Sequence, residues 1–126
     1  NVCASCGLAA GLRFVQQQTP QRLLAHEVRQ RKLLTSLLTD VPGVRLFTGE
    51  PQSGTLSLCA AQMDCETLAA RLAVKGVCVR AGLHCAPLAH ESAGTLETGT
   101  VRFSLSAFNT EQEIFRTADL LKEILA

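Results

Sequence analysis

Apolar positions first recur at helical spacing in the segment that follows Gln18. Thr19 belongs to a residue type favoured at helix N-caps, and Pro20 suits the first helical position. The pattern predicts a helix from Thr19 to about residue 40, with its arginines and glutamines facing solvent. The apolar stripe of this helix would be Leu24, Val28, Leu34, Leu37 and Leu38. Residues 3–18, rich in small and apolar side chains, predict a preceding helix.

A two-residue alternation then replaces the helical period. Residues 44–49 and 55–60 alternate in this way around a turn-forming segment, which predicts two paired strands. Two shorter alternating stretches, Val77–Arg80 and residues 100–106, predict two further strands. Between residues 81 and 99 no period is visible, and we expect a loop.

Two more helices complete the pattern. Asp64 is a good N-cap for a helix that runs to Lys75, and Gly76 would stop it. Thr110 and Glu113 have the spacing of a capping box at the start of the last helix. The inward residues would be Leu68 and Leu72 in the first helix, and Ile114, Ala118, Leu121 and Leu125 in the last.

The order helix, helix, strand, strand, helix, strand, strand, helix predicts an α+β fold. We expect a two-layer sandwich in which helices cover one face of a mainly antiparallel sheet. Residues 19–126 would form this domain. The chain begins with small and apolar residues and has no initiating Met, so we interpret residues 1–18 as a helix leading in from a missing large domain.

Alternation also places two arginines. If Val101 and Phe103 face the helices, Arg102 points away from them, and Arg80 leaves its strand on the same open face. Two guanidiniums there would suit a carboxylate, which each can bind through parallel hydrogen bonds. The simpler interpretation is two ordinary solvated arginines, and the pattern alone leaves both open.

Composition narrows the function. The net charge is +1, aromatic residues make up 4% and there is no Trp or Tyr, so a nucleic-acid partner is not expected. No apolar run is long enough for a membrane span. The six cysteines sit in a chain that is 47% hydrophobic, and we interpret them as reduced thiols of a cytoplasmic protein.

Cys85 is the candidate for chemistry. It lies in the loop segment VRAGLHCAPLAH, between Gly82 and Pro87, where loop residues are more often exposed and functional. His84 and Arg80 beside it would favour the reactive thiolate. A buried structural thiol is the competing interpretation. A third is a metal or redox module, in which zinc would be bound by residues drawn from Cys3, Cys6, His84, Cys85 and His90.

The segment VRAGLHCAPLAH and the later segment GTLETGTVRFSLSAFNTEQEI closely resemble the C-terminal part of cysteine desulfurases. These are class-V, fold-type-I aminotransferases that use pyridoxal phosphate. The resemblance covers essentially the whole chain and implies the small C-terminal domain of a longer enzyme. By this resemblance Cys85 is the persulfide-forming cysteine, Arg102 holds the substrate carboxylate, Arg80 supports it and His84 tunes the nucleophile.

The resemblance implies that the full-length enzyme removes sulfur from L-cysteine. The cofactor loosens the bond to sulfur, the Cys85 thiolate takes the sulfur as a persulfide, and alanine leaves. It further implies a homodimer, and a sulfur-acceptor protein in processes such as iron–sulfur cluster assembly. A selenocysteine lyase or an aminotransferase of the same class remains an alternative.

The lysine that holds the cofactor in this family has no counterpart here. Lys32, Lys75 and Lys122 lie in helices or at a helix end, without the family's sequence context. The family's Gly-Thr-Pro phosphate segment would precede Asn1. We therefore expect this chain alone to bind no pyridoxal phosphate and no metal, and to be inactive.

Overall fold

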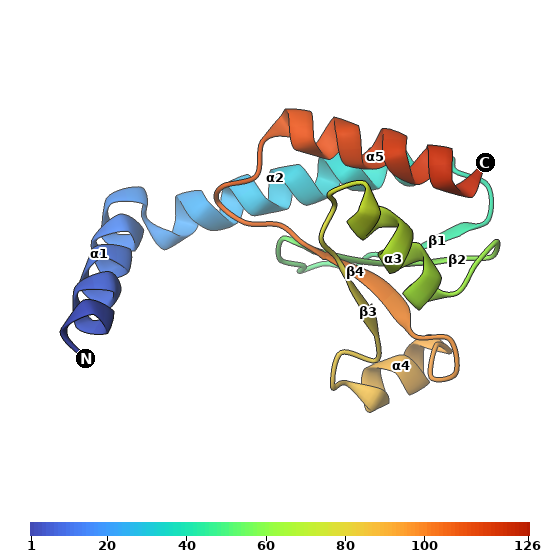
Figure 1. Ribbon diagram of the computed structural model, residues 1–126, viewed down its shortest axis with the longest axis horizontal. Coiled ribbons are helices and arrows are strands. Elements are labelled where there is room, and N and C mark those ends of the chain that lie inside the picture. Colours follow the sequence, from blue (N-terminus) through green and yellow to red (C-terminus); the bar gives the residue numbers. More distant parts are fainter.

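The elements follow the predicted order, with one helix added. The structure is a computed structural model that describes residues 1–126. Its elements are α1 (Val2–Gln18), α2 (Pro20–Leu38), β1 (Val44–Phe47), β2 (Thr55–Ala60), α3 (Cys65–Val74), β3 (Arg80–Gly82), α4 (Pro87–Ala93), β4 (Thr100–Ser104) and α5 (Glu111–Leu125) (Figure 1).

The four strands form one antiparallel sheet in the order β1-β2-β4-β3. Helices α2 and α5 run side by side along one face of the sheet, and α3 packs beneath α5 (Figure 1). The core between the layers consists of Leu34, Leu38, Leu56, Leu58, Leu68, Leu72, Val101, Phe103, Ile114, Ala118, Leu121 and Leu125. The predicted α+β fold is confirmed.

The predicted inward stripes of α3 and α5 are buried without exception. Asp64 accepts a hydrogen bond from the Thr67 backbone N–H, and Thr110 and Glu113 form the predicted capping box. Helix ends so capped satisfy backbone groups that would otherwise be orphaned. They fix where α3 and α5 begin.

Helix α2 differs from its prediction on both faces. Gln30 and Arg31 are only 1% and 3% exposed, although polar residues between the leucines were expected to face solvent. Leu24 is instead 50% exposed. The reason is that the sheet and α5 cover only the second half of this long helix, and they cover more of its circumference there than a narrow apolar stripe implies (Figure 1).

Thr19 does not cap α2 with its side chain. Its backbone N–H donates to the Val15 carbonyl oxygen at 2.9 Å and so closes α1, and its φ of 63° turns the chain between the two helices. The residue thus serves the end of α1 more than the start of α2. Pro20 occupies the first turn of α2 as predicted.

The strand predicted at Val77–Arg80 is displaced. Val77 donates its backbone N–H to the Leu72 carbonyl oxygen at 2.9 Å, in the C-terminal cap of α3 around Gly76, which has a φ of 83°. The Val77 N–H is therefore not available for strand pairing, which begins only at Arg80. Val77 and Val79 still pack against the core, as the alternation predicted.

The expected loop contains a short helix, α4, which the hydrophobic pattern missed. Its one buried side chain is a histidine, His90, so it has no apolar stripe to detect. Pro87 in its first turn and Gly94 in the left-handed conformation after its last residue were the available signals.

Helix α1 stands apart from the sandwich (Figure 1). None of its residues is buried, and Phe14 stacks on Phe108 with ring centroids 5.4 Å apart. Its proposed origin in a larger domain stays a prediction. No helix here combines the length and the apolar content that crossing a membrane requires.

Candidate active site at the Cys85 loop

Cys85 lies in the connection between β3 and α4, where the backbone is held in an uncommon conformation. Both His84, with φ 53°, and Cys85, with φ 59°, occupy the left-handed region. For residues other than glycine this costs roughly 1–2 kcal/mol each. Strain of this kind tends to gather at functional sites. The Ala86 N–H donates to the Leu83 carbonyl oxygen at 2.9 Å and closes the turn.

The Cys85 side chain is exposed and its thiol is free. All six cysteines of the chain are free, in agreement with the predicted reduced state. Burial raises the pKa of Cys59, whose Sγ donates to the Gly99 carbonyl oxygen at 3.3 Å. Cys59 therefore stays a protonated thiol more readily than an exposed cysteine. Cys85 is exposed, so the interpretation of its thiol as a buried structural group finds no support.

The His84 side chain holds the loop to the sheet. Its Nε2 lies 3.0 Å from Oγ1 of Thr100, the first residue of β4. Its Nδ1 is buried without a hydrogen-bond partner. Burial lowers the pKa of His84, and the charges of Arg102, His90 and Arg80 lower it further. The ring is therefore neutral at pH 7, and any tuning of Cys85 comes from position rather than from an imidazolium charge.

A second histidine supports the first. His90 of α4 is 6% exposed, and its Nδ1 lies 2.8 Å from Oγ1 of Thr95. The His84 and His90 rings lie with centroids 5.7 Å apart. Sequence reasoning missed Thr95 and Thr100, although Thr100 shares a strand face with Arg102. These contacts tie the Cys85 loop, α4 and β4 together.

The two predicted arginines are direct neighbours. Arg80 and Arg102 are partners in the antiparallel register of β3 and β4, so their side chains leave the same sheet face. On its other side Arg102 is opposite Ser57 of β2. The Nε atom of Arg102 is buried without a hydrogen-bond partner. Two like charges and an unfilled donor together favour a bound anion such as a carboxylate.

Sheet register brings these groups to one place. Gly82, at the end of β3, is opposite Thr100, which His84 contacts, and Arg102 follows two residues later on the same strand face. Cys85 thus directly follows His84, whose ring lies close enough to Arg102 and Arg80 for their charges to lower its pKa, at the end of the sheet where α4 lies (Figure 1).

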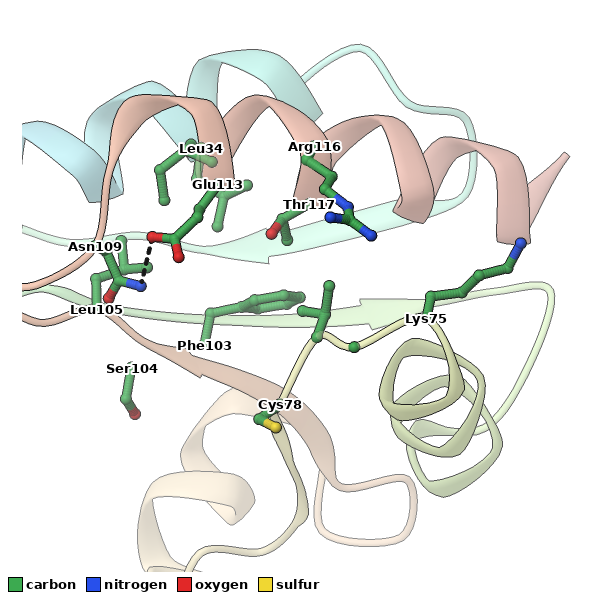
Figure 2. Close-up of a pocket in the computed structure, with 13 residues that line it drawn as sticks. Leu34, Lys75, Cys78, Phe103, Ser104, Leu105, Asn109, Glu113, Arg116 and Thr117 are labelled. Atoms are coloured by element: carbon green, nitrogen blue, oxygen red, sulfur yellow. Dashed lines mark hydrogen bonds between the residues drawn. The ribbon is translucent and has the colours of Figure 1, made fainter.

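A hollow on the opposite side of β4 does not belong to this arrangement. Figure 2 shows it between the segment around Cys78 and helix α5, with Phe103 at its floor. Three of its polar side chains, those of Asn109, Glu113 and Lys75, are engaged in structure. Glu113 accepts from Asn109 and from the Thr110 N–H, and Lys75 pairs with Glu123 at 3.0 Å. It contains neither Cys85 nor Arg80 nor Arg102.

The metal and redox alternative finds no geometric support. No three His, Cys, Asp or Glu side chains come together as a metal site would require. Cys3 and Cys6 lie in α1, and His84 and His90 are already engaged with threonine hydroxyls.

Nor do the residues of this chain fit pyridoxal phosphate as a complete site. Lys32 is in α2, Lys122 is in α5, and Lys75 caps α3. All three belong to the helix layer, whereas Arg80 and Arg102 occupy the opposite sheet face. No lysine therefore faces the arginines.

Known proteins are similar to this chain in both sequence and fold. The aminotransferase class-V family matches residues 1–116. A probable cysteine desulfurase of Mycolicibacterium paratuberculosis is 37% identical over 115 residues, which cover 90% of this chain and 16% of that protein.

Two solved structures agree with this match. The apo cysteine desulfurase of Thermococcus onnurineus superposes with a TM-score of 0.86 at 26% identity, covering 94% of this chain and 30% of that one. The Escherichia coli cysteine desulfurase CsdA, described as an S-sulfonic acid, gives 0.84 at 25% identity, covering 95% and 30%. The chain thus spans less than a third of each of these three proteins.

Proposed function

The chain belongs to the aminotransferase class-V family, and on that premise we propose that it is the C-terminal small domain of a pyridoxal-phosphate-dependent cysteine desulfurase. The observation that carries the proposal is the exposed, strained Cys85 in the loop that follows β3, the strand on which Arg80 pairs with Arg102. The similarity to cysteine desulfurases over 90% of the chain supports it.

In this proposal Arg102 binds the carboxylate of L-cysteine. Its half-buried guanidinium has an unfilled Nε donor, and a planar carboxylate accepts two parallel hydrogen bonds from such a group. Arg80, directly across the ladder, adds positive charge from an exposed position. The substrate is thereby oriented with its sulfur toward the Cys85 loop.

Cys85 is the proposed nucleophile. Its thiolate forms a bond to the substrate sulfur while the carbon–sulfur bond of the substrate breaks. The electron pair of that bond stays with carbon, which takes up a proton and leaves as alanine, and Cys85 keeps the sulfur as a persulfide. Residues outside this chain would hold the cofactor, which would supply an electron sink for cleavage of the carbon–sulfur bond.

The wider setting of the reaction is part of the same proposal. The exposed persulfide passes its sulfur to an acceptor protein, as iron–sulfur cluster assembly requires. The whole enzyme works as a homodimer in the cytoplasm, where free cysteines are the rule.

Alanine release from L-cysteine tests the assignment in a longer protein that carries this chain together with a cofactor domain. We expect Cys85→Ser to abolish alanine release, and Cys78→Ser, at another exposed cysteine, to leave it intact. Alanine release that survives in Cys85→Ser would contradict the proposal. Conversion of L-cysteine to its keto acid without release of alanine would favour an aminotransferase, which needs no thiol at this position.

A further inference from the structure

A second polar site lies far from Cys85 in the topology of the sheet. We define the Arg31 hollow by its lining residues, which are Arg31, Lys32, Thr35, Ser36, Thr39, Thr48, Gly49 and Glu50. They come from α2 and from the connection between β1 and β2. Strand β1 is at one edge of the sheet and β3, which leads to Cys85, is at the other. The hollow is therefore separate from the proposed active site.

Arg31 is an unusual residue to find buried. Its side chain is 3% exposed, yet its Nε and Nη2 atoms have no hydrogen-bond partner. A guanidinium keeps its charge in proteins and carries five N–H donors. A buried charge that lacks acceptors is costly, so this position is one where an acceptor would be strongly held.

The chain itself supplies only a poor acceptor. Glu50 Oε1 lies 3.5 Å from Arg31 Nη2, at ion-pair distance but without a hydrogen bond, and its side chain is 72% exposed. Such an exposed carboxylate contributes little binding energy and can move into solvent. Glu50 thus lies against the Arg31 guanidinium without accepting a hydrogen bond from it.

The rest of the hollow also suits an anion. It has a volume of about 410 Å³ and no hydrophobic lining residue. Lys32 adds a second positive charge, and Thr35 Oγ1 is buried without a hydrogen-bond partner one helical turn from Arg31. The Ser36 hydroxyl already donates to the Leu33 carbonyl oxygen, and the Thr39 hydroxyl donates to the Thr35 carbonyl oxygen. The side-chain donors left for a ligand are therefore Arg31, Lys32, Thr35 and the exposed hydroxyl of Thr48.

We propose that the Arg31 hollow binds a phosphate group. Arginine binds phosphate through two parallel hydrogen bonds, and a tetrahedral anion has further oxygens for Lys32 and the Thr35 hydroxyl. The phosphate takes the place of the Glu50 carboxylate, which swings outward. The volume leaves room for a small molecule attached to the phosphate, so both free phosphate and a phosphomonoester share the required chemistry.

The test is a calorimetric titration of the 126-residue chain with inorganic phosphate, phenyl phosphate and acetate, at an ionic strength held constant with sodium chloride. We expect Arg31→Met, which keeps most of the side-chain volume, to weaken phosphate binding at least about tenfold. Arg29→Met is the matched control. Arg29 lies in the same helix but is 67% exposed and paired with Glu111, and its loss leaves phosphate binding unchanged.

Glu50→Gln gives an independent result that does not depend on the stability of an Arg31 variant. Removing the competing negative charge should tighten phosphate binding about threefold or more. Unchanged or weaker binding in Glu50→Gln overturns the proposal, as does acetate binding as tightly as phosphate. Tighter binding of phenyl phosphate than of phosphate identifies a phosphomonoester as the ligand, and equal binding identifies free phosphate.

Discussion

At the scale of single residues, backbone and surroundings set Cys85 apart from the other cysteines. Cys3, Cys6 and Cys78 are exposed as well, so exposure alone does not distinguish it. Only Cys85 has a left-handed backbone, and only Cys85 adjoins the histidine that is fastened to β4 beside Arg102. The position of Cys85 was predictable from its motif, whereas the strain that presents it was not, because no local pattern encodes two consecutive left-handed residues.

Alkylation rates measure this difference. With iodoacetamide at pH 7 we expect Cys85 to be labelled faster than Cys59 and Cys78. Cys59 should be slow because burial raises its pKa and leaves little thiolate. Cys78 is the exposed control outside the loop, two residues before Arg80. Peptide mass spectrometry after short labelling times gives the three rates, and Cys85 labelling no faster than Cys78 would argue against a special site.

His84 should make the stability of the chain depend on pH. Its pKa is lowered from 6.5 in the folded state, so the unfolded chain binds more protons as pH falls below 6.5. The contribution of His84 to the stability of the folded state is therefore complete above pH 6.5 and is lost as the pH falls below 6.5. Urea denaturation at pH 7.5 and at pH 5.5 should show a smaller loss of stability for His84→Gln than for the unsubstituted chain. Equal losses in both would disprove this effect.

At the scale of elements, capping chemistry decides where helices and strands begin and end. The same rule explains one success and one failure of sequence reasoning. Asp64 and the Thr110–Glu113 pair were recognisable because the cap lies within three residues. The strand expected at Val77 failed because its N–H is taken by the cap of α3. An alternating pattern shows which residues face inward but not which backbone donors remain free.

Thr110→Ala tests the cap of α5 directly. The Thr110 hydroxyl accepts from the Glu113 N–H, and the Glu113 carboxylate accepts from the Thr110 N–H at 2.8 Å. Losing the hydroxyl should lower the free energy of unfolding by about 1 kcal/mol. Gln112→Ala, an exposed substitution in the same turn, is the control and should change stability little. Equal effects of the two in urea denaturation would mean that the capping box contributes nothing.

The burial of Gln30 and Arg31 shows a different limit of prediction. The hydrophobic period identified Leu34, Leu37 and Leu38, which pack in or against the core, but it wrongly included Leu24 and assigned every polar residue between the leucines to solvent. Coverage of α2 by α5 and the β1–β2 connection is a tertiary property, and a local pattern does not contain it. The Arg31 hollow was missed for this reason, whereas Arg80 and Arg102 were found because strand alternation depends on the strand alone.

At the scale of the whole molecule, this chain contains only some of the groups that the proposed desulfurase site needs. The open sheet face carries two arginines, and an exposed thiol lies in the loop after β3, while all three lysines belong to the helix layer. The chain spans 16% of its mycobacterial relative and 30% of the two solved enzymes. The proposed substrate-binding arginines and the proposed nucleophile would need an electron sink from outside this chain, which is why the proposed activity belongs to the longer protein.

The most direct measurement is the mass of the peptide that contains Cys85 after the longer, cofactor-loaded protein has reacted with L-cysteine in the absence of a reductant. We expect the added mass of one sulfur atom on Cys85, none on Cys78, and none anywhere after Arg102→Met at low substrate concentration. The proposed role of Cys85 would be contradicted by extra sulfur on another cysteine with Cys85 unmodified. It would also be contradicted by sulfur loading that is unchanged in Arg102→Met.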